Sequence, residues 1–430
     1  MGLNASNFPL RLSVLDQSPV PAGSTPSQAL ANSLDLARHV DALGYTRLWY
    51  SEHHAMDLLA STAPEILVAR AAAETSRIRV GTGGIMLPHY SAFKVAEVFR
   101  TLHAMFPNRI DLGIGRAPGG GQLEAYALRR DRKNPVSDDF PLQLAELRAY
   151  LHPERFAELL GPNHPFARIR VAPDAPGAPD IWLLGSSMWS AVTAAQQGLP
   201  YAFAHFFSPI QTRRAIEYYQ ANFVPSTSRI SSGPQPSASQ STSTSRISPG
   251  PQPSASQSTS SPRISSGLQP TDSQSTREPG FSPGPYEYDR QTPEATLAIG
   301  VICAPTDAEA EHLAASVRLL QRRIRMDDRR PVATPEDALR ELALLPTAPN
   351  PLIPFTAGSL DAPEDNEWPT YFTGTPEKVA AQLRNLASEL HLKEIIINTI
   401  THSHEARKRS YSLLAEAIGL ATPHAEAVAV

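Results

Sequence analysis

Outside one long polar segment, the chain alternates between short apolar runs and longer stretches whose apolar residues recur at helical spacing. Short apolar runs predict buried strands, and a repeat at every third or fourth position predicts helices packed on a core. The expected strands are 10–17, 45–52, 77–87, 109–115, 180–185, 200–207, 294–304 and 393–400. The expected helices are 26–44, 63–76, 92–106, 187–198, 209–223, 307–324, 376–390 and 405–419.

The order of these elements predicts the fold class. Strands that alternate with helices pair in parallel, because a parallel connection needs a long crossover. Eight such units predict an α/β protein with a closed (β/α)8 TIM barrel rather than an open doubly wound sheet. No Gly-x-Gly-x-x-Gly follows the first expected strand, which further disfavours a dinucleotide-binding unit.

The polar segment at 227–285 has a composition unlike the rest of the chain. A 17-residue unit rich in Ser, Pro and Gln is written three times, starting at Arg229, Arg246 and Arg263. The unit carries almost no large apolar side chains, so it buries too little surface to offset its ordering entropy. We expect a disordered insertion, with a docking segment as the alternative. Residues 1–226 and 286–430 are then the N-terminal and C-terminal parts of the barrel.

Composition narrows the classes of partner. A formal net charge of −4 gives no reason to expect nucleic acid or an anionic membrane. The single cysteine, Cys303, excludes an internal disulfide framework and fits a reducing compartment. Residues 1–18 show no signal peptide, and no apolar run approaches the roughly 18 residues that span a bilayer. We therefore expect a cytoplasmic protein that acts on a small molecule.

Candidate chemistry first appears in the stretch RLWYSEHHAM, at the end of the second expected strand. Glu52, His53 and His54 follow its apolar residues directly. Catalytic groups of such barrels lie at the carboxyl ends of the strands, and imidazole exchanges protons near neutral pH. A metal site is the alternative, but adjacent histidines lack the spacing of His-Glu-x-x-His. Because neighbouring strand residues point to opposite faces, His53 and Glu52 can share a pocket only if the strand already turns there.

Five motifs in register resemble the bacterial luciferase-like flavin monooxygenases: SEHH, VGTGGIMLPHY, NRIDLGIGRAPG, LLGSSMWSAVTAAQQGLPYAFA and GTPEKVAAQL. The resemblance covers most of the chain except the insertion and 122–178. It implies an oxidoreductase acting on paired donors, in which reduced flavin mononucleotide (FMN) from a separate flavin reductase activates the co-substrate O2 as a flavin C4a-peroxide. The product would be an oxygenated small organic molecule.

By the same resemblance, His53 corresponds to the family's catalytic histidine and Glu52 to a carboxylate near the flavin. His54 is a candidate for the substrate pocket, with hydrogen bonding to the backbone as the structural alternative. Asp16, His89 and Tyr90, which follow two other expected strands, are further pocket candidates.

The flavin phosphate requires clustered donors. Arg116 follows a Gly-rich strand end, and its guanidinium can grip a phosphate bidentately. Ser187 and Ser190 stand at the start of an expected helix, where free N–H groups favour an anion. The resemblance assigns all three to phosphate binding. Without it, Ser187 is a plain N-cap and Arg116 a surface residue.

Two glycines, Gly83 and Gly84, interrupt the third expected strand. Glycines there indicate a bulge or the close approach of another group. The resemblance implies a non-prolyl peptide bond, sometimes cis, against the flavin ring, which makes both residues cofactor-binding candidates. A bulge that only shapes the barrel is the alternative.

One departure limits what the resemblance implies. Bacterial luciferase has a reactive cysteine where this chain has Gly115, so light emission and a preference for long-chain aldehydes are not expected. The loop 118–141 is a candidate lid over the site. Two other functions remain open: hydride transfer with a deazaflavin, and a non-catalytic flavin-binding partner subunit. A homodimer is expected only by analogy.

Overall fold

The structure is a computed structural model that describes residues 10–128, 130, 139–225, 290–345 and 367–420. These residues belong to one compact unit. The predicted insertion and its three repeats fall outside the described residues, so their disorder stays a prediction. Within the described ranges, no helix is long and apolar enough to cross a membrane.

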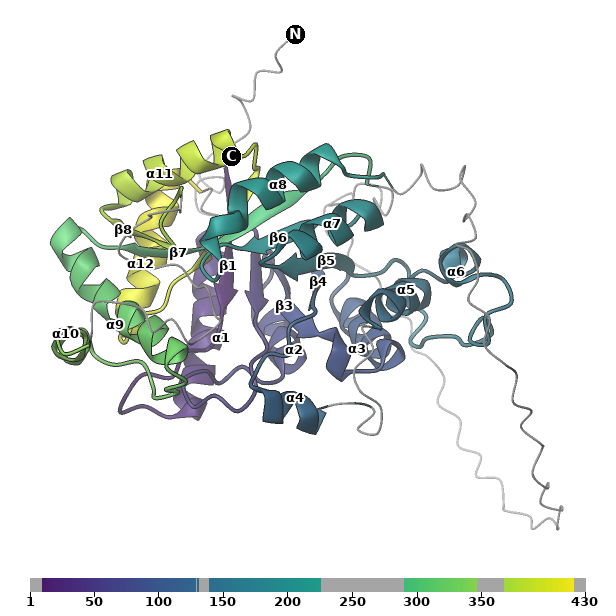
Figure 1. Ribbon diagram of the computed structural model, residues 1–430, viewed down its shortest axis with the longest axis horizontal. Coiled ribbons are helices and arrows are strands. Elements are labelled where there is room, and N and C mark those ends of the chain that lie inside the picture. Colours follow the sequence, from purple (N-terminus) through teal and green to yellow (C-terminus); the bar gives the residue numbers. More distant parts are fainter. Residues whose placement is uncertain (1–9, 129, 131–138, 226–289, 346–366, 421–430) are drawn as a thin grey trace, which may run out of the picture. The chain divides into compact units, whose positions relative to one another are not determined.

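Eight parallel strands close into a barrel (Figure 1). They are β1 (Arg11–Asp16), β2 (Arg47–Tyr50), β3 (Arg79–Met86), β4 (Ile110–Gly115), β5 (Asp180–Gly185), β6 (Tyr201–Ala204), β7 (Ala295–Cys303) and β9 (Glu394–Asn398). Each pairs with its neighbour in this order, and β9 pairs with β1 to close the ring. The eight strands and the TIM-barrel fold predicted from the sequence are confirmed.

A ninth strand was not predicted. The short β8 (Tyr371–Gly374) pairs with the second half of β7, from Gly300 to Cys303, while the first half of β7 pairs with β9. β7 is therefore long enough to pair within the barrel along its first half and with the additional strand β8 along its second half.

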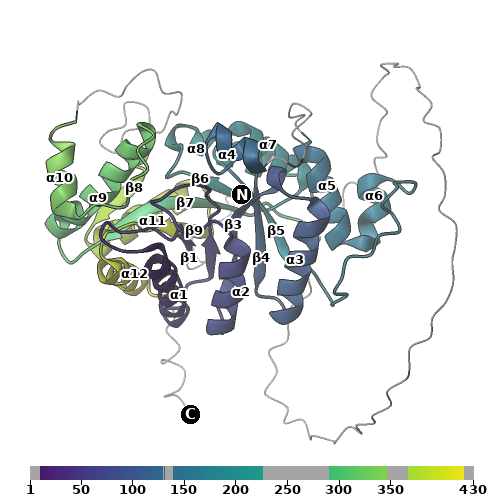
Figure 2. The same ribbon diagram turned by 90° about the horizontal axis from the view of Figure 1, so that it is seen from below.

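Helices cover the outside of the barrel. Those that follow barrel strands or β8 are α1 (Pro26–Ala42), α2 (Pro64–Glu74), α3 (Ala92–Met105), α7 (Met188–Gln197), α8 (Thr212–Ala221), α9 (Asp307–Arg325), α11 (Pro376–Glu389) and α12 (His404–Ile418). Figure 2 shows α12, α1, α2 and α3 side by side along one flank, in agreement with their contacts. Local signals set several ends: Thr25, Thr306 and Ser403 cap N-termini with their hydroxyls.

Further short helices lie in the connections. They are α4 (Gln122–Leu128), α5 (Phe140–Leu151), α6 (Phe156–Leu160), α10 (Pro335–Leu342) and the 3-10 turns η1 (Leu87–His89), η2 (Pro153–Arg155) and η3 (Pro209–Gln211). Three of these helices fall in 122–178, where the sequence pattern was too irregular for a prediction.

Alternation along the strands builds two cores. Leu12, Val14 and Leu48 face the helices, in a large cluster between barrel and helix layer. Leu15, Trp49 and Trp182 fill the barrel interior with Ala202, Ala298 and Ile396. The two indoles meet edge to face, with ring centroids 5.2 Å apart, a favoured aromatic geometry.

A buried ion-pair network lies at the amino ends of the strands. Arg47 donates from Nε to Glu394 Oε1 at 2.6 Å and from Nη1 to Asp111 Oδ2 at 2.8 Å. Asp111 also accepts from Arg79 Nε at 2.8 Å and from Trp49 Nε1 at 2.9 Å. Arg47, Asp111 and Glu394 are at most 5% exposed. Because every charge in this group has an opposite neighbour, the network closes one end of the barrel without an unpaired buried charge.

Candidate functional site

The structure brings the main candidate residues to the carboxyl ends of the strands. Glu52, His53 and His54 follow β2, Gly83 and Gly84 lie in β3, and Arg116 follows β4. Ser187 caps α7 directly after β5. Strand ends that are adjacent in a barrel place these groups around one opening, where TIM-barrel active sites are found.

His53 is the third residue after β2, and its side chain is partly exposed. Its Nδ1 is 3.0 Å from Ser51 Oγ. Its backbone N–H donates to Ser61 O at 2.9 Å, which fixes the loop. Burial, together with the nearby His54, lowers the pKa of His53 to about 4. The imidazole is therefore neutral at cellular pH, and the lowered pKa makes it a weaker base than a free imidazole.

Glu52 is fully buried. Its Oε1 accepts from His54 Nε2 and from the Tyr90 hydroxyl, both at 2.7 Å. Its Oε2 accepts from the Met86 backbone N–H at 2.9 Å. A catalytic role for Glu52 stays a prediction.

His54, His89 and Tyr90 surround this carboxylate. The rings of His54 and His89 meet edge to face at 5.9 Å, and those of His89 and Tyr90 at 6.5 Å. His54 N donates to Gly119 O at 2.8 Å. Burial, followed by the charge and hydrogen bond of Glu52, raises the pKa of Tyr90, so its hydroxyl stays a donor. The three pocket candidates thus cluster, with partly exposed side chains.

The Gly83–Gly84 peptide bond is cis, and the β3–β4 register shifts between Thr82 and Ile85. A Cβ at Gly83 would lie 2.8 Å from Leu15 Cδ1, and one at Gly84 would lie 2.6 Å from Gly113 O. Packing of the Leu15 and Trp49 side chains leaves little space at Gly83, and close approach of the Gly113 backbone explains Gly84. Contact with a flavin stays a prediction.

The phosphate candidates meet at the start of α7. The Arg116 guanidinium lies over the Trp189 ring, 3.9 Å from its centroid, a cation–π geometry that orients the guanidinium. Ser187 caps the helix without a side-chain hydrogen bond. Ser190 is buried, and its Oγ donates to Ser187 O at 2.7 Å and lies 2.9 Å from the Tyr201 hydroxyl. An anion therefore fits beside Arg116 and the helix start, whereas the Ser190 hydroxyl is held inside the protein.

Asp16 lies on the helix-facing side of β1, like Leu12 and Val14. It is fully buried and accepts from Arg407 Nη2 at 2.7 Å. Its assignment to the pocket stays a prediction that these contacts do not support. The next residue, Gln17, lies on the inner side, where its Oε1 accepts from Asn398 Nδ2 at 2.7 Å.

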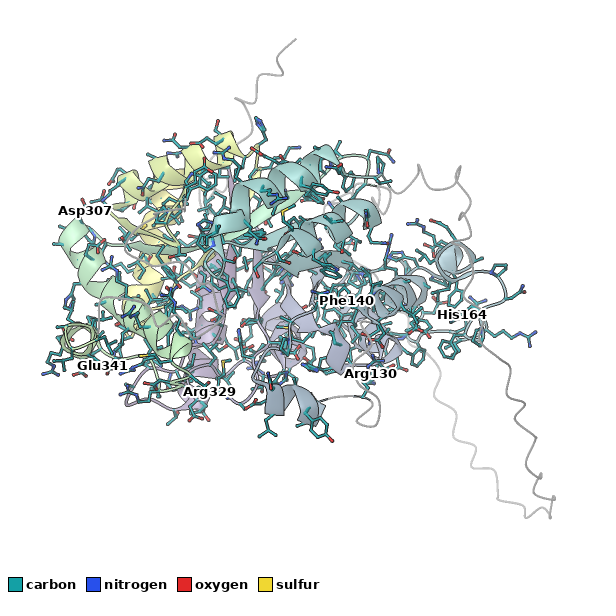
Figure 3. All side chains as sticks on the ribbon, viewed as in Figure 1. Arg130, Phe140, His164, Asp307, Arg329 and Glu341 are labelled. Atoms are coloured by element: carbon teal, nitrogen blue, oxygen red, sulfur yellow. The ribbon has the colours of Figure 1, made fainter. Side chains whose placement is uncertain are left out.

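Sequence reasoning placed Gln17 beside Asp16 at the active face, but two features of the opening were not predicted. One is the pairing of Gln17 with Asn398, and the other is a clasp formed by Arg329, which follows α9. Arg329 Nη1 donates to Ala55 O at 2.9 Å and to Glu124 Oε1 at 3.1 Å, and Figure 3 shows Arg329 beside α4. The clasp joins the loop after β2 to the candidate lid 118–141, part of which lies outside the described residues.

Metal ligands do not converge here. Within the described ranges, no group of three His, Cys, Asp or Glu side chains could hold a metal ion.

Comparison with known proteins identifies the family and the fold. The luciferase-like monooxygenase family model matches residues 10–237. The uncharacterized protein YceB of Bacillus subtilis (strain 168) is 36% identical over 409 residues, which cover 95% of this chain and 99% of YceB. The crystal structure of apo-MsnO8 superposes with a TM-score of 0.72 at 40% identity, covering 96% of this chain and 99% of MsnO8.

More distant structures share the fold alone. The oxygenating constituent of 3,6-diketocamphane monooxygenase from Pseudomonas putida, in complex with FMN, has a TM-score of 0.57 at 16% identity, covering 96% of this chain and 98% of its own. An F420-dependent secondary alcohol dehydrogenase has a TM-score of 0.54 at 12% identity with the same coverage. The family match, with its extensive coverage, makes the chain a member of the luciferase-like monooxygenase family, an oxidoreductase built on a TIM barrel.

Proposed function

We propose that this chain is a monooxygenase that uses reduced FMN and O2 to oxygenate a small organic molecule. The observation that carries the proposal is the neutral, partly exposed His53 in the loop directly after β2, at the same barrel end as Gly83–Gly84 and Arg116. These residues offer a proton acceptor, a strand segment without side chains for the flavin ring, and an anion site for the phosphate.

Different residues of the chain bind the phosphate, contact the flavin ring and handle the proton. Arg116 binds the phosphate together with Ser187 and the N–H groups of α7 that follow Met188, because the Met188 N–H already donates to Gln211 Oε1 at 3.1 Å. Ser190 supports this turn through its bond to Ser187 O. The strand segment that carries Gly83 and Gly84 lies against the ring, and His53 accepts or returns a proton beside it. Reduced flavin, when bound, supplies the electrons that activate O2.

A separate flavin reductase would deliver the reduced cofactor. The structural neighbour that binds FMN is described as the oxygenating constituent of its enzyme, which supports a second constituent for this chain too. We keep a homodimer as a proposal by analogy with the family.

Anaerobic titration with reduced FMN tests the proposal, with reduced F420, a deazaflavin, as the competing probe. The proposal expects saturable binding of reduced FMN that is tighter than that of F420, and reoxidation of the bound flavin on mixing with O2. Binding of F420 in preference to FMN would contradict it and favour hydride transfer. Binding of neither would also contradict it.

A further inference from the structure

Glu52 joins three segments of the site. Its two oxygens accept from His54 Nε2 in the same loop, from Met86 N at the end of β3, and from the Tyr90 hydroxyl after η1. It is 0% exposed. A carboxylate with three donors and no solvent exposure has little capacity left to exchange a proton with a ligand.

The β3 register explains why a side chain is needed there. β2 and β3 pair from Arg47↔Arg79 to Tyr50↔Thr82, and the register shift between Thr82 and Ile85 follows immediately. Past that point, the Glu52 carboxylate reaches the Met86 N–H. Glu52 therefore continues the connection of β2 to β3 on the far side of Gly83–Gly84.

The same carboxylate fixes the histidine loop. His54 is held between Glu52 Oε1 and the backbone of Gly119, and His53 is the residue between Glu52 and His54. Tyr90 approaches the same Oε1, so its hydroxyl limits the positions that the carboxylate can adopt. A shift of Glu52 would move His53 relative to the strand that carries Gly83–Gly84.

We infer that Glu52 is a positioning residue rather than a proton-transfer group, and that Tyr90 acts with it to hold His53 in register with Gly83–Gly84. The inference rests on the proposed function only where it makes His53 the base. The linkage of β2 to β3 through Glu52 is a separate claim, open to test without any flavin.

Hydrogen exchange of the protein without flavin tests the linkage. Tyr90→Phe and Glu52→Gln are compared with Tyr45→Phe, a matched control that loses a buried hydroxyl bond to Tyr411 O (2.9 Å) at the other barrel end. Exchange in peptides covering 51–56 and 84–90 should rise about fivefold in Tyr90→Phe and about tenfold or more in Glu52→Gln. Unchanged exchange there, or an equal rise in Tyr45→Phe, overturns the inference.

Single-turnover reoxidation of reduced FMN by O2 then separates positioning from proton transfer. Both site variants should reoxidise the flavin with a rate changed at least about fivefold, while the midpoints of the pH profile and the affinity for reduced FMN stay as in the unmodified chain. Loss of one limb of the profile in Glu52→Gln alone overturns the inference by making Glu52 a proton-transfer group. Should Glu52→Gln not fold, Tyr90→Phe decides both measurements.

Failure of the proposed function gives a different pattern. Reduced FMN would then not bind the unmodified chain, although exchange in 51–56 and 84–90 would still respond to Tyr90→Phe.

Discussion

At the amino ends of the strands, Arg47, Asp111 and Glu394 meet opposite charges directly. At the carboxyl ends, Glu52 is met by an amide, a phenol and an imidazole, and Asn398 Oδ1 has no hydrogen-bond partner within the described residues. Burial alone would raise the pKa of Asp111, but Arg79 and Arg47 lower it. Burial of His53 lowers its pKa without such compensation.

This contrast separates stability from function. In a network of opposite charges every donor and acceptor already has a partner, so the network stabilises the packing of the strands. Neutral donors and acceptors around an opening keep capacity for a ligand. The barrel thus closes its amino end with a network of charges, whereas at the carboxyl ends saturated groups such as Glu52 lie near groups with capacity left, such as Asn398 Oδ1.

The largest loss of stability should follow a substitution in the ion-pair network at the amino ends of the strands. Arg47→Leu removes the guanidinium that pairs with both oxygens of buried Glu394 and one of the two arginines that pair with buried Asp111, so the free energy of unfolding should fall by about 3–5 kcal/mol. Urea unfolding measures this, with Arg340→Gln as the control, because Arg340 pairs with Asp337 at an exposed position. A loss below about 1 kcal/mol would mean that the network does not stabilise the barrel.

Acid should weaken the fold through buried histidines. His205, fully buried between Thr212 Oγ1 and Pro369 O, has its pKa lowered by burial from 6.5 to about 4. Between these values the unfolded chain binds a proton that the folded chain does not. The free energy of unfolding should therefore fall as pH drops from 6.5 to 4, by roughly 3 kcal/mol for such a group.

Urea unfolding at several pH values between 4 and 7 measures this slope. His205→Gln should flatten it, and His53→Gln should flatten it in the same direction, because the pKa of His53 is also about 4. An unchanged slope in both variants would contradict the lowered pKa values.

Arg116→Gln tests the assignment of a phosphate site to the carboxyl ends of the strands. A charge-assisted bond to phosphate is worth about 1.5–3 kcal/mol, so affinity for reduced FMN should fall roughly 10- to 100-fold. Reduced riboflavin, which lacks the phosphate, serves as the control ligand and should bind the variant as it binds the unmodified chain. Equal losses for both ligands would remove Arg116 from the phosphate site.

The smallest effect should come from the clasp. Arg329 and Glu124 are 30% and 20% exposed, so Arg329→Gln should cost at most about 1 kcal/mol. Limited proteolysis near α4 should nevertheless become faster, because Arg329 also holds Ala55 O. Unchanged cleavage would show that the clasp does not restrain α4.

The fold could be predicted because its signals are local. Short apolar runs mark every barrel strand, and apolar residues at helical spacing mark the helices around the barrel. By contrast, β8 has only four residues and depends on the unusual length of β7. α4 has no buried residue, so the sequence contains no apolar face that would predict this helix.

The candidate site could be predicted where strand ends carry the chemistry, as with His53 and Arg116. Contacts between distant segments left no local pattern: Gln17 and Asn398 are separated by 381 positions, and Arg329 and Glu124 by 205. After the first strand, alternation places Asp16 on the helix-facing side and Gln17 on the inner side, so the pocket assignment of Asp16 stays a prediction.

The most direct test of the account is the reaction of His53→Gln with O2 after loading with reduced FMN. His312→Gln is the control, because His312 is exposed and pairs with Glu336 at 3.1 Å, on the surface of α9. If His53 handles the proton at this barrel end, His53→Gln keeps its affinity for reduced FMN and its flavin chemistry slows by about 100-fold or more, while His312→Gln reacts normally. Full reaction rate in His53→Gln would contradict the account.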